Sequence, residues 1–312
     1  MIYTEELTKI FDNRITAVDE LNLEIPTGEI FGFLGPNGAG KTTTVRLLSC
    51  ILQASKGEAV VAEYSIHDDP EQLRKNVGLL SENPSLYERL SARKNLDVIG
   101  RLYGLTKEQV NLRIIELAKL LDLHRYLDMK AGKLSKGNKH KVAIARAILH
   151  EPKVLFLDEP TASLDPEASL IVREIIEKFT NAYECTVFIC THNLPEAERL
   201  CDRVGIINKG SLATIGSPES LQKASSPLTT IEIELAHLKK DQLIRLQQIP
   251  GVEGLFSDLN SSKIVFQTSN PTETVPSVVR EIVLQDGAIL SVERKTKTLE
   301  DLYFEIVGRR ND

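Results

Sequence analysis

The segment GPNGAGKT at 35–42 brings glycines, a lysine and a threonine together at the spacing G-x-x-x-x-G-K-[ST]. Glycines let successive backbone N–H groups curl around phosphate oxygens, and the helix that follows adds the positive end of its dipole. In this arrangement Lys41 reaches the β- and γ-phosphates, and the Thr42 hydroxyl binds Mg²⁺. The alternative is a glycine-rich structural turn, but an apolar run at 29–35 precedes the segment and a helical pattern follows it, as a phosphate loop requires. The sequence therefore predicts a nucleoside triphosphate site.

Two carboxylates end a further apolar run, VLFLDEP at 154–160. Asp158 would bind Mg²⁺ through its water shell, and Glu159 would orient or deprotonate an attacking water. Such a pair on its own is more often a solvated strand end. Because a phosphate loop lies upstream, the pair instead indicates hydrolysis of the bound nucleotide.

His192 follows the apolar run TVFI and is another polar residue at the end of an expected strand. A single histidine is more often a structural hydrogen-bonding group than a catalytic one. The expected strand ends on the same sheet edge as the phosphate loop and the acidic pair, so a contact with the γ-phosphate is favoured. No companion His or Cys stands at metal-ligand spacing, and metal binding by His192 is not expected.

A parallel sheet would bring these residues together, and the pattern of the chain predicts one. The candidates for buried strands lie at 29–35, 77–82, 154–159 and 186–192. Helical segments fall between them, including 166–179 and 194–201. Strands that alternate with helices predict an α/β fold, with ligands at the carboxyl ends of the strands.

Three regions differ from this alternation. Strand-like patterns open the chain in IYTEELTKI and ITAVDELNLEI, whereas 83–150 has helical periodicity and no strand candidate. A Ser/Pro-containing link at about 216–228 leads into segments that read β-α-β-β-α-β and a final helix. That order predicts a small ferredoxin-like α+β unit, in which we find no nucleotide or metal motif.

Composition limits the classes of partner. The formal net charge of −6 disfavours a dedicated nucleic-acid binder, and no nucleic-acid partner is expected. The four cysteines show no C-x-x-C spacing, which is typical of reduced thiols in a cytoplasmic protein. No window holds the roughly 18 apolar residues of a membrane span, so we expect any membrane role to require a partner.

Together, GPNGAGKT, LSKGN (134–138), VLFLDE (154–159), SLD (163–165) and His192 resemble the ATP-binding subunits of ABC transporters. Ordinary P-loop ATPases lack the LSKGN segment. The resemblance covers about 1–220. It implies a P-loop NTPase fold of ABC type, with an antiparallel β subdomain and a helical subdomain at about 83–150. The region 229–312 resembles the accessory α+β domain of many ABC-2-type exporter ATPases.

The resemblance implies a set of nucleotide contacts within one subunit. Phe11 would stack on adenine, and Val18 would lie beside the base. Phosphate contacts would come from Asn37, Gly38, Ala39, Gly40, Lys41, Thr42 and Thr43. The Mg²⁺ ligands would be Thr42, Asp158 and Glu82, which stands where most relatives have a glutamine. The plainer alternative for Glu82 is a surface glutamate at a strand end.

Other residues would act across a dimer. Ser135, the Gly137 backbone and Asn138 belong to LSKGN, which stands where the family usually shows LSGGQ. They would meet the γ-phosphate of a nucleotide held by the other subunit. Asp165 would lie at the dimer seam. It is also well placed to cap a helix ahead of Pro166, and the two roles are compatible.

The resemblance implies an ATPase that uses ATP and Mg²⁺, with Lys41, Glu159 and His192 as catalytic residues. It would power a transporter, an exporter by analogy, through a separate multi-span permease at the cytoplasmic face of the membrane. It would pair with an identical or a different ABC ATPase. One alternative is a soluble mechanical ABC ATPase acting on ribosomes or nucleic acid, but such relatives usually carry two heads, coiled coils or basic arms. A module that binds ATP without turnover is disfavoured because all three catalytic residues are present.

Overall fold

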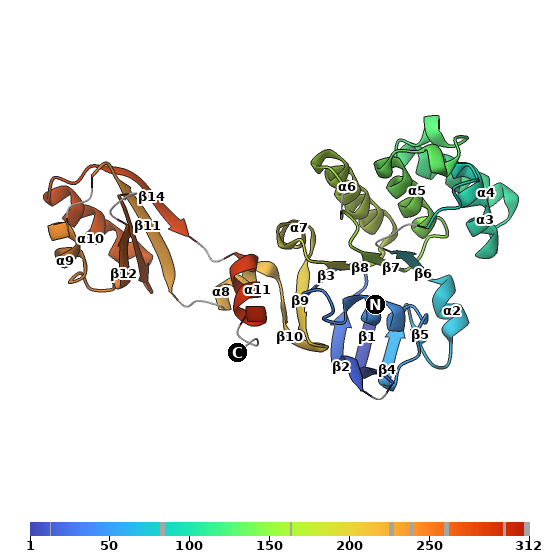
Figure 1. Cartoon of the computed structure of the whole chain (residues 1–312), viewed down its shortest axis with the longest axis horizontal. Coiled ribbons are helices and arrows are strands. Elements are labelled where there is room, and N and C mark those ends of the chain that lie inside the picture. The colour runs from blue at the N-terminus through green and yellow to red at the C-terminus, as the bar shows by residue number, and fades with distance from the viewer. Residues whose placement is uncertain are drawn as a thin grey trace. The chain divides into compact units, whose positions relative to one another are not determined.

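The computed structural model describes residues 1–12, 14–81, 85–162, 164–224, 228–237, 240–258, 262–295 and 298–308. Backbone contacts divide the chain into two compact units (Figure 1). One is Met1–Pro218 with the chain from Ile306 onwards, and the other is Glu219–Glu305. The division into domains at 1–220 and 229–312 stays a prediction. No described helix is both long and apolar enough to span a bilayer.

A six-stranded sheet in the order β10-β9-β3-β8-β7-β6 is the centre of the first unit. The β6, β7, β8, β3 and β9 strands pair in parallel, whereas β10 forms an antiparallel hairpin with β9. The strands are β3 (Ile30–Leu34), β6 (Val77–Leu80), β7 (Val154–Asp158), β8 (Thr186–Thr191), β9 (Arg203–Asn208) and β10 (Ser211–Gly216). Every residue of β3, β7 and β8 is buried, which explains their continuous apolar sequences.

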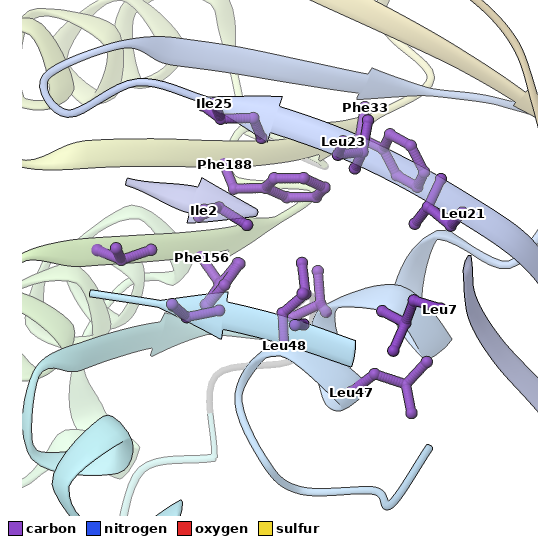
Figure 2. Packing of buried hydrophobic residues seen from close by; sticks show 14 of the residues in the cluster. Ile2, Leu7, Leu21, Leu23, Ile25, Phe33, Leu47, Leu48, Phe156 and Phe188 are labelled. Carbon is purple, nitrogen blue, oxygen red and sulfur yellow. The ribbon is translucent and has the colours of Figure 1, made fainter. Parts of the chain in front are cut away.

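A second sheet, β2-β1-β4-β5, is antiparallel and lies on one side of the parallel sheet (Figure 1). Its strands are β1 (Ile2–Phe11), β2 (Ile15–Ile25), β4 (Lys56–Val61) and β5 (Tyr64–Ser65). Figure 2 shows the core between the sheets, to which α1 (Lys41–Leu48) adds Leu47 and Leu48. The Phe188 ring lies 5.2 Å from that of Phe33 and 5.6 Å from that of Phe156.

Helices cover the opposite side of the parallel sheet (Figure 1). The predicted helical insertion contains α3 (Ala92–Leu102), α4 (Lys107–Leu120) and α5 (Lys136–Ile148), with short 3₁₀ turns at His124–Tyr126 and Ala131–Lys133. The first unit also contains α2 (Pro70–Lys75), α6 (Pro166–Tyr183) and α7 (Leu194–Leu200). Local chemistry starts these helices: Thr106 and Gln109 form a reciprocal capping box at α4.

The second unit confirms the predicted β-α-β-β-α-β order. It comprises β11 (Thr229–Leu235), α9 (Lys240–Leu246), β12 (Glu253–Asp258), β13 (Lys263–Thr268), α10 (Pro271–Leu284) and β14 (Ile289–Lys295). The antiparallel sheet runs β12-β13-β11-β14, as in ferredoxin-like folds. Ile231 and Ile233 of β11 pack with Val278 and Ile282 of α10 in its own core. The remaining helices are α8 (Pro218–Ala224) and α11 (Leu299–Gly308).

His150 links the helical insertion to the parallel sheet. Its Nε2–H donates to the backbone carbonyl of Val77 in β6 at 3.0 Å, and its ring stacks on Tyr103 with centroids 3.6 Å apart. Burial lowers the pKa of His150 from 6.5 to about 4, despite the Val77 hydrogen bond. The folded protein therefore holds this imidazole neutral.

We predict that His150 makes the fold acid-sensitive. Between pH 6.5 and about 4 the unfolded chain binds a proton at His150 that the folded chain does not, so the free energy of unfolding falls as the pH falls. The full pKa difference corresponds to about 3 kcal/mol. His150→Gln keeps a donor for Val77 but cannot titrate. We expect urea denaturation, followed by circular dichroism, to show that the free energy of unfolding falls more for wild type than for this variant between pH 7 and pH 4.5. Parallel pH profiles of the two proteins would contradict the prediction.

Candidate nucleotide-binding site

The phosphate loop connects β3 to α1, and its glycines are required by the backbone. Gly38 and Gly40 have positive φ angles of 80° and 111°. A Cβ at Gly40 would lie 2.3 Å from the carbonyl oxygen of Ala17, and one at Gly35 would lie 2.5 Å from that of Ile207. The loop therefore packs directly against the neighbouring backbone, and only glycine fits.

A cavity of about 300 Å³ opens over this loop. Its lining consists of Ala17, Pro36, Asn37, Gly38, Gly40, Lys41, Thr42, Thr43, Asp158, Glu159 and His192. The predicted loop residues thus share one cavity with the predicted catalytic residues, except that Ala39 is only 3% exposed and packs in the core. Its volume lies at the lower end of the range for small-molecule sites.

Lys41 and Thr42 begin helix α1 beneath this cavity. The Lys41 ammonium donates to the carbonyls of Gly35 at 2.6 Å and Pro36 at 3.2 Å, so it lies folded over the loop. The Thr42 hydroxyl donates to Oδ2 of Asp158 at 3.0 Å. Two side-chain oxygen atoms from distant parts of the chain therefore meet, and oxygen is the ligand atom that Mg²⁺ prefers.

Glu159 is held in a defined orientation at the end of β7. Its backbone is left-handed, with φ 53°, a conformation that is uncommon for residues other than glycine. Its Oε1 lies 2.7 Å from His192 Nδ1, and the Thr191 hydroxyl donates to Oε2 at 3.3 Å. The Glu159 side chain is 12% exposed and that of His192 is 64% exposed. Both contacts with Glu159 were missed by the sequence analysis, which assigned Glu159 and His192 separate tasks.

The residues predicted to contact the base lie in different surroundings. Phe11 ends β1 with 36% exposure, and the Lys9 ammonium lies 5.2 Å from its ring centroid. Val18 is fully buried in the core between the sheets, whereas Ala17 lines the cavity. The base contact by Val18 stays a prediction, and Ala17, the preceding residue of the strand, is the one that lines the cavity. Glu82 lies outside the described residues.

The residues predicted to act across a dimer lie outside the lining of this cavity. Ser135 caps α5 by accepting from the Asn138 N–H at 3.3 Å. Asp165 caps α6 by accepting from the Ala168 N–H at 2.8 Å, with Pro166 next to it, which confirms the capping role. Ser135 and Asp165 are exposed, and Gly137 and Asn138 are half-buried.

Comparison with known proteins agrees with this geometry. Residues 18–162 match the family model described as ABC transporter. The chain is 37% identical to the bacitracin transport ATP-binding protein BcrA of Bacillus licheniformis, over 99% of this chain and 97% of that protein. It is 35% identical to the uncharacterized ABC transporter ATP-binding protein YhcH of Bacillus subtilis, over 95% and 93% of the two chains. The chain belongs to the ABC transporter family of ATP-binding proteins.

Solved structures agree with the assignment of this chain to the ABC family. The chain is similar to a dimeric post-hydrolysis state of the ATP-binding cassette MJ0796 bound to ADP and Pi, with 25% identity and a TM-score of 0.63. That match covers 70% of this chain and 98% of the other. The predicted ABC-type fold and ATPase class are confirmed, and these relatives do not favour the alternative of a mechanical ATPase on ribosomes or nucleic acid.

We predict that Gly40→Ala weakens binding of a fluorescent ATP analogue at least about 10-fold, equivalent to about 1.4 kcal/mol. The added Cβ would press on the Ala17 carbonyl and displace the phosphate loop. Gly104→Ala is a matched control, because Gly104 also has a positive φ, 84°, but no atom within 4 Å of its added Cβ. Equal affinities for the two variants would show that the close packing of the loop is not required.

Proposed function

We propose that this ABC ATPase powers export through a separate multi-span permease, peripherally bound at the cytoplasmic face of the membrane. The observation that carries the proposal is the match to the bacitracin transport protein along almost the whole of both chains. That match extends through the second unit, which the predicted nucleotide site does not use. We also propose that the accessory region 229–312 regulates the ATPase or supports its dimer.

In the proposed site, Asn37–Thr43 bind the phosphates of ATP and Phe11 stacks on its base. Thr42 and Asp158 would hold Mg²⁺, and their 3.0 Å hydrogen bond supports this because it brings two suitable oxygens together. Glu82 would be a further ligand. A Mg²⁺ ion held there would supply positive charge to offset the charge that develops on the phosphates. Among the described residues no group of three or more His, Cys, Asp and Glu side chains could hold a metal ion.

Three side chains would act in hydrolysis. Lys41 exchanges the Gly35 and Pro36 carbonyls for phosphate oxygens, which attract its charge more strongly. Glu159 orients the attacking water and accepts its proton. His192 fixes the Glu159 carboxylate by their 2.7 Å contact and reaches the γ-phosphate from its exposed position.

The LSKGN segment would serve the nucleotide of a second ABC ATPase. Gly137 lies in the first turn of α5. Among the described residues an added Cβ would approach only Ala168, at 4.0 Å, so the packing of this part of the chain does not explain the glycine. Close approach of a phosphate from the facing subunit does. Ser135, Asn138 and Asp165 would line the same interface, in a homodimer or a heterodimer.

We predict that Glu159→Gln lowers kcat for ATP hydrolysis about 100-fold or more, because the amide cannot accept the proton of water. The variant should still bind ATP and should form a stable ATP-bound dimer, measured by size-exclusion chromatography. Glu177→Gln, at an exposed position of α6, is the control and should match wild type. Rapid steady-state hydrolysis by Glu159→Gln would refute the assignment of Glu159.

Purification of the tagged chain from detergent-solubilised membranes of its own cells tests the transport proposal. We expect a multi-span membrane protein to co-purify in a fixed ratio, because the described part of this chain has no helix that could span the membrane. The same preparation made without detergent should retain less of that partner. Recovery with ribosomes or nucleic acid instead would overturn the proposal.

A further inference from the structure

The turn that follows Glu159 is anchored by a buried polar pair. The Thr161 hydroxyl donates to Oε2 of Glu196 at 2.6 Å, although the two residues are 35 positions apart in the sequence. Thr161 is 8% exposed and Glu196 only 3%. Burial raises the pKa of the Glu196 carboxyl, and the hydrogen bond from Thr161 acts in the opposite direction and lowers this pKa. A buried carboxyl is costly unless it is hydrogen-bonded, so the pair forms a strong constraint on this turn.

The Thr161–Glu196 pair closes a ring of hydrogen bonds around the proposed catalytic carboxylate. Glu159 accepts from the Thr191 hydroxyl, which in turn accepts from the Asn193 N–H at 3.0 Å. The Asn193 side chain accepts from the Glu196 N–H at 3.2 Å, and Glu196 accepts from Thr161. The Ala162 N–H donates back to the Glu159 carbonyl at 3.1 Å. Movement of Glu196 would therefore be transmitted to Glu159 along both the turn and the start of α7.

A second buried side chain holds the same turn from the helix that begins at LSKGN. His140 lies in α5, five residues after Ser135, and is 5% exposed. Burial lowers the pKa of its imidazole, and a hydrogen-bonding contact with the backbone of Pro160 opposes that shift. The Pro160–Thr161 step is thus fixed by α5 on one side and by α7 on the other.

We propose that Thr161, Glu196 and His140 are positioning residues for ATP hydrolysis, which hold the Pro160–Thr161 turn and through it the Glu159 carboxylate. The proposal rests on the proposed role of Glu159 as the residue that activates water. The proposal also connects the two nucleotide sites of a dimer. Helix α5 starts at LSKGN, which in the proposed dimer faces the nucleotide of the other subunit, and the same helix carries His140, which lies at the turn beside Glu159 of its own subunit. A change at the start of α5 would reach Glu159 through His140 and the Pro160–Thr161 turn.

A paired substitution tests the positioning role without leaving a buried carboxyl unpaired. Thr161→Val combined with Glu196→Leu replaces both partners by apolar groups of similar shape, which is often nearly neutral for stability. We expect kcat for ATP to fall about 10- to 100-fold, because small misplacements of catalytic groups are expensive. Affinity for a fluorescent ATP analogue and the thermal unfolding midpoint should stay close to wild type. Thr161→Ser keeps the donor and should retain most of the wild-type kcat.

Substitutions at His140 give a second, independent test of the proposal. His140→Asn keeps an N–H donor for the Pro160 backbone and should preserve kcat, whereas His140→Leu removes the donor and should lower kcat with little effect on nucleotide affinity. Wild-type kcat in the folded Thr161→Val/Glu196→Leu variant would overturn the proposal, as would parallel losses of kcat, affinity and stability. Glu159→Gln is measured in the same assay. If this variant hydrolyses ATP at the wild-type rate, the proposed role of Glu159 is wrong. If it is inactive, the result for Thr161→Val/Glu196→Leu tests the positioning role separately.

Discussion

The parallel pairing of β3, β8 and β7 is the constraint on which the nucleotide site depends. Leu34 pairs with Thr191, and Cys190 pairs with Asp158, so the three strands end side by side. The residues just beyond these ends are the phosphate loop, His192 and Glu159, which therefore share one cavity. Phe188 packs against Phe33 and Phe156 of the neighbouring strands, so aromatic contacts in the core link all three strands. A change in this packing would shift the residues at the strand ends without touching the nucleotide.

Features of this ATPase that depend on local chemistry could be predicted from its sequence. The phosphate loop follows from glycine geometry and from its place between a strand and a helix. The cap at Asp165 needs only a short polar side chain and the following proline. The β-α-β-β-α-β order of the second unit was predicted from the alternation of apolar patterns and matches the structure. In each case the determining residues lie within a few positions of one another.

Features that depend on register and tertiary contact could not be predicted. The pairing of β1 with β2 shifts register on both sides of the Lys9–Val18 pair, and Ala17 lines the cavity whereas Val18 is buried in the core. Alternation along β2 therefore does not reveal which face meets the cavity. The contacts of Glu159 with His192, and of Thr161 with Glu196, join residues 33 and 35 positions apart. They also depend on the left-handed backbone at Glu159, for which the sequence carries no signal.

The hydrogen bonds of Lys41 have a consequence for the entropy of binding. Its ammonium is already immobilised by two carbonyls of the loop, and the loop glycines already adopt their left-handed conformations. The conformational freedom of the loop is thus lost when the chain folds and does not have to be lost again when a nucleotide arrives. With the proposed role of Lys41, phosphate binding would be an exchange of acceptors at a preorganised cation. Discrimination between nucleotides would then depend on the charge they present to Lys41 rather than on their capacity to order the loop.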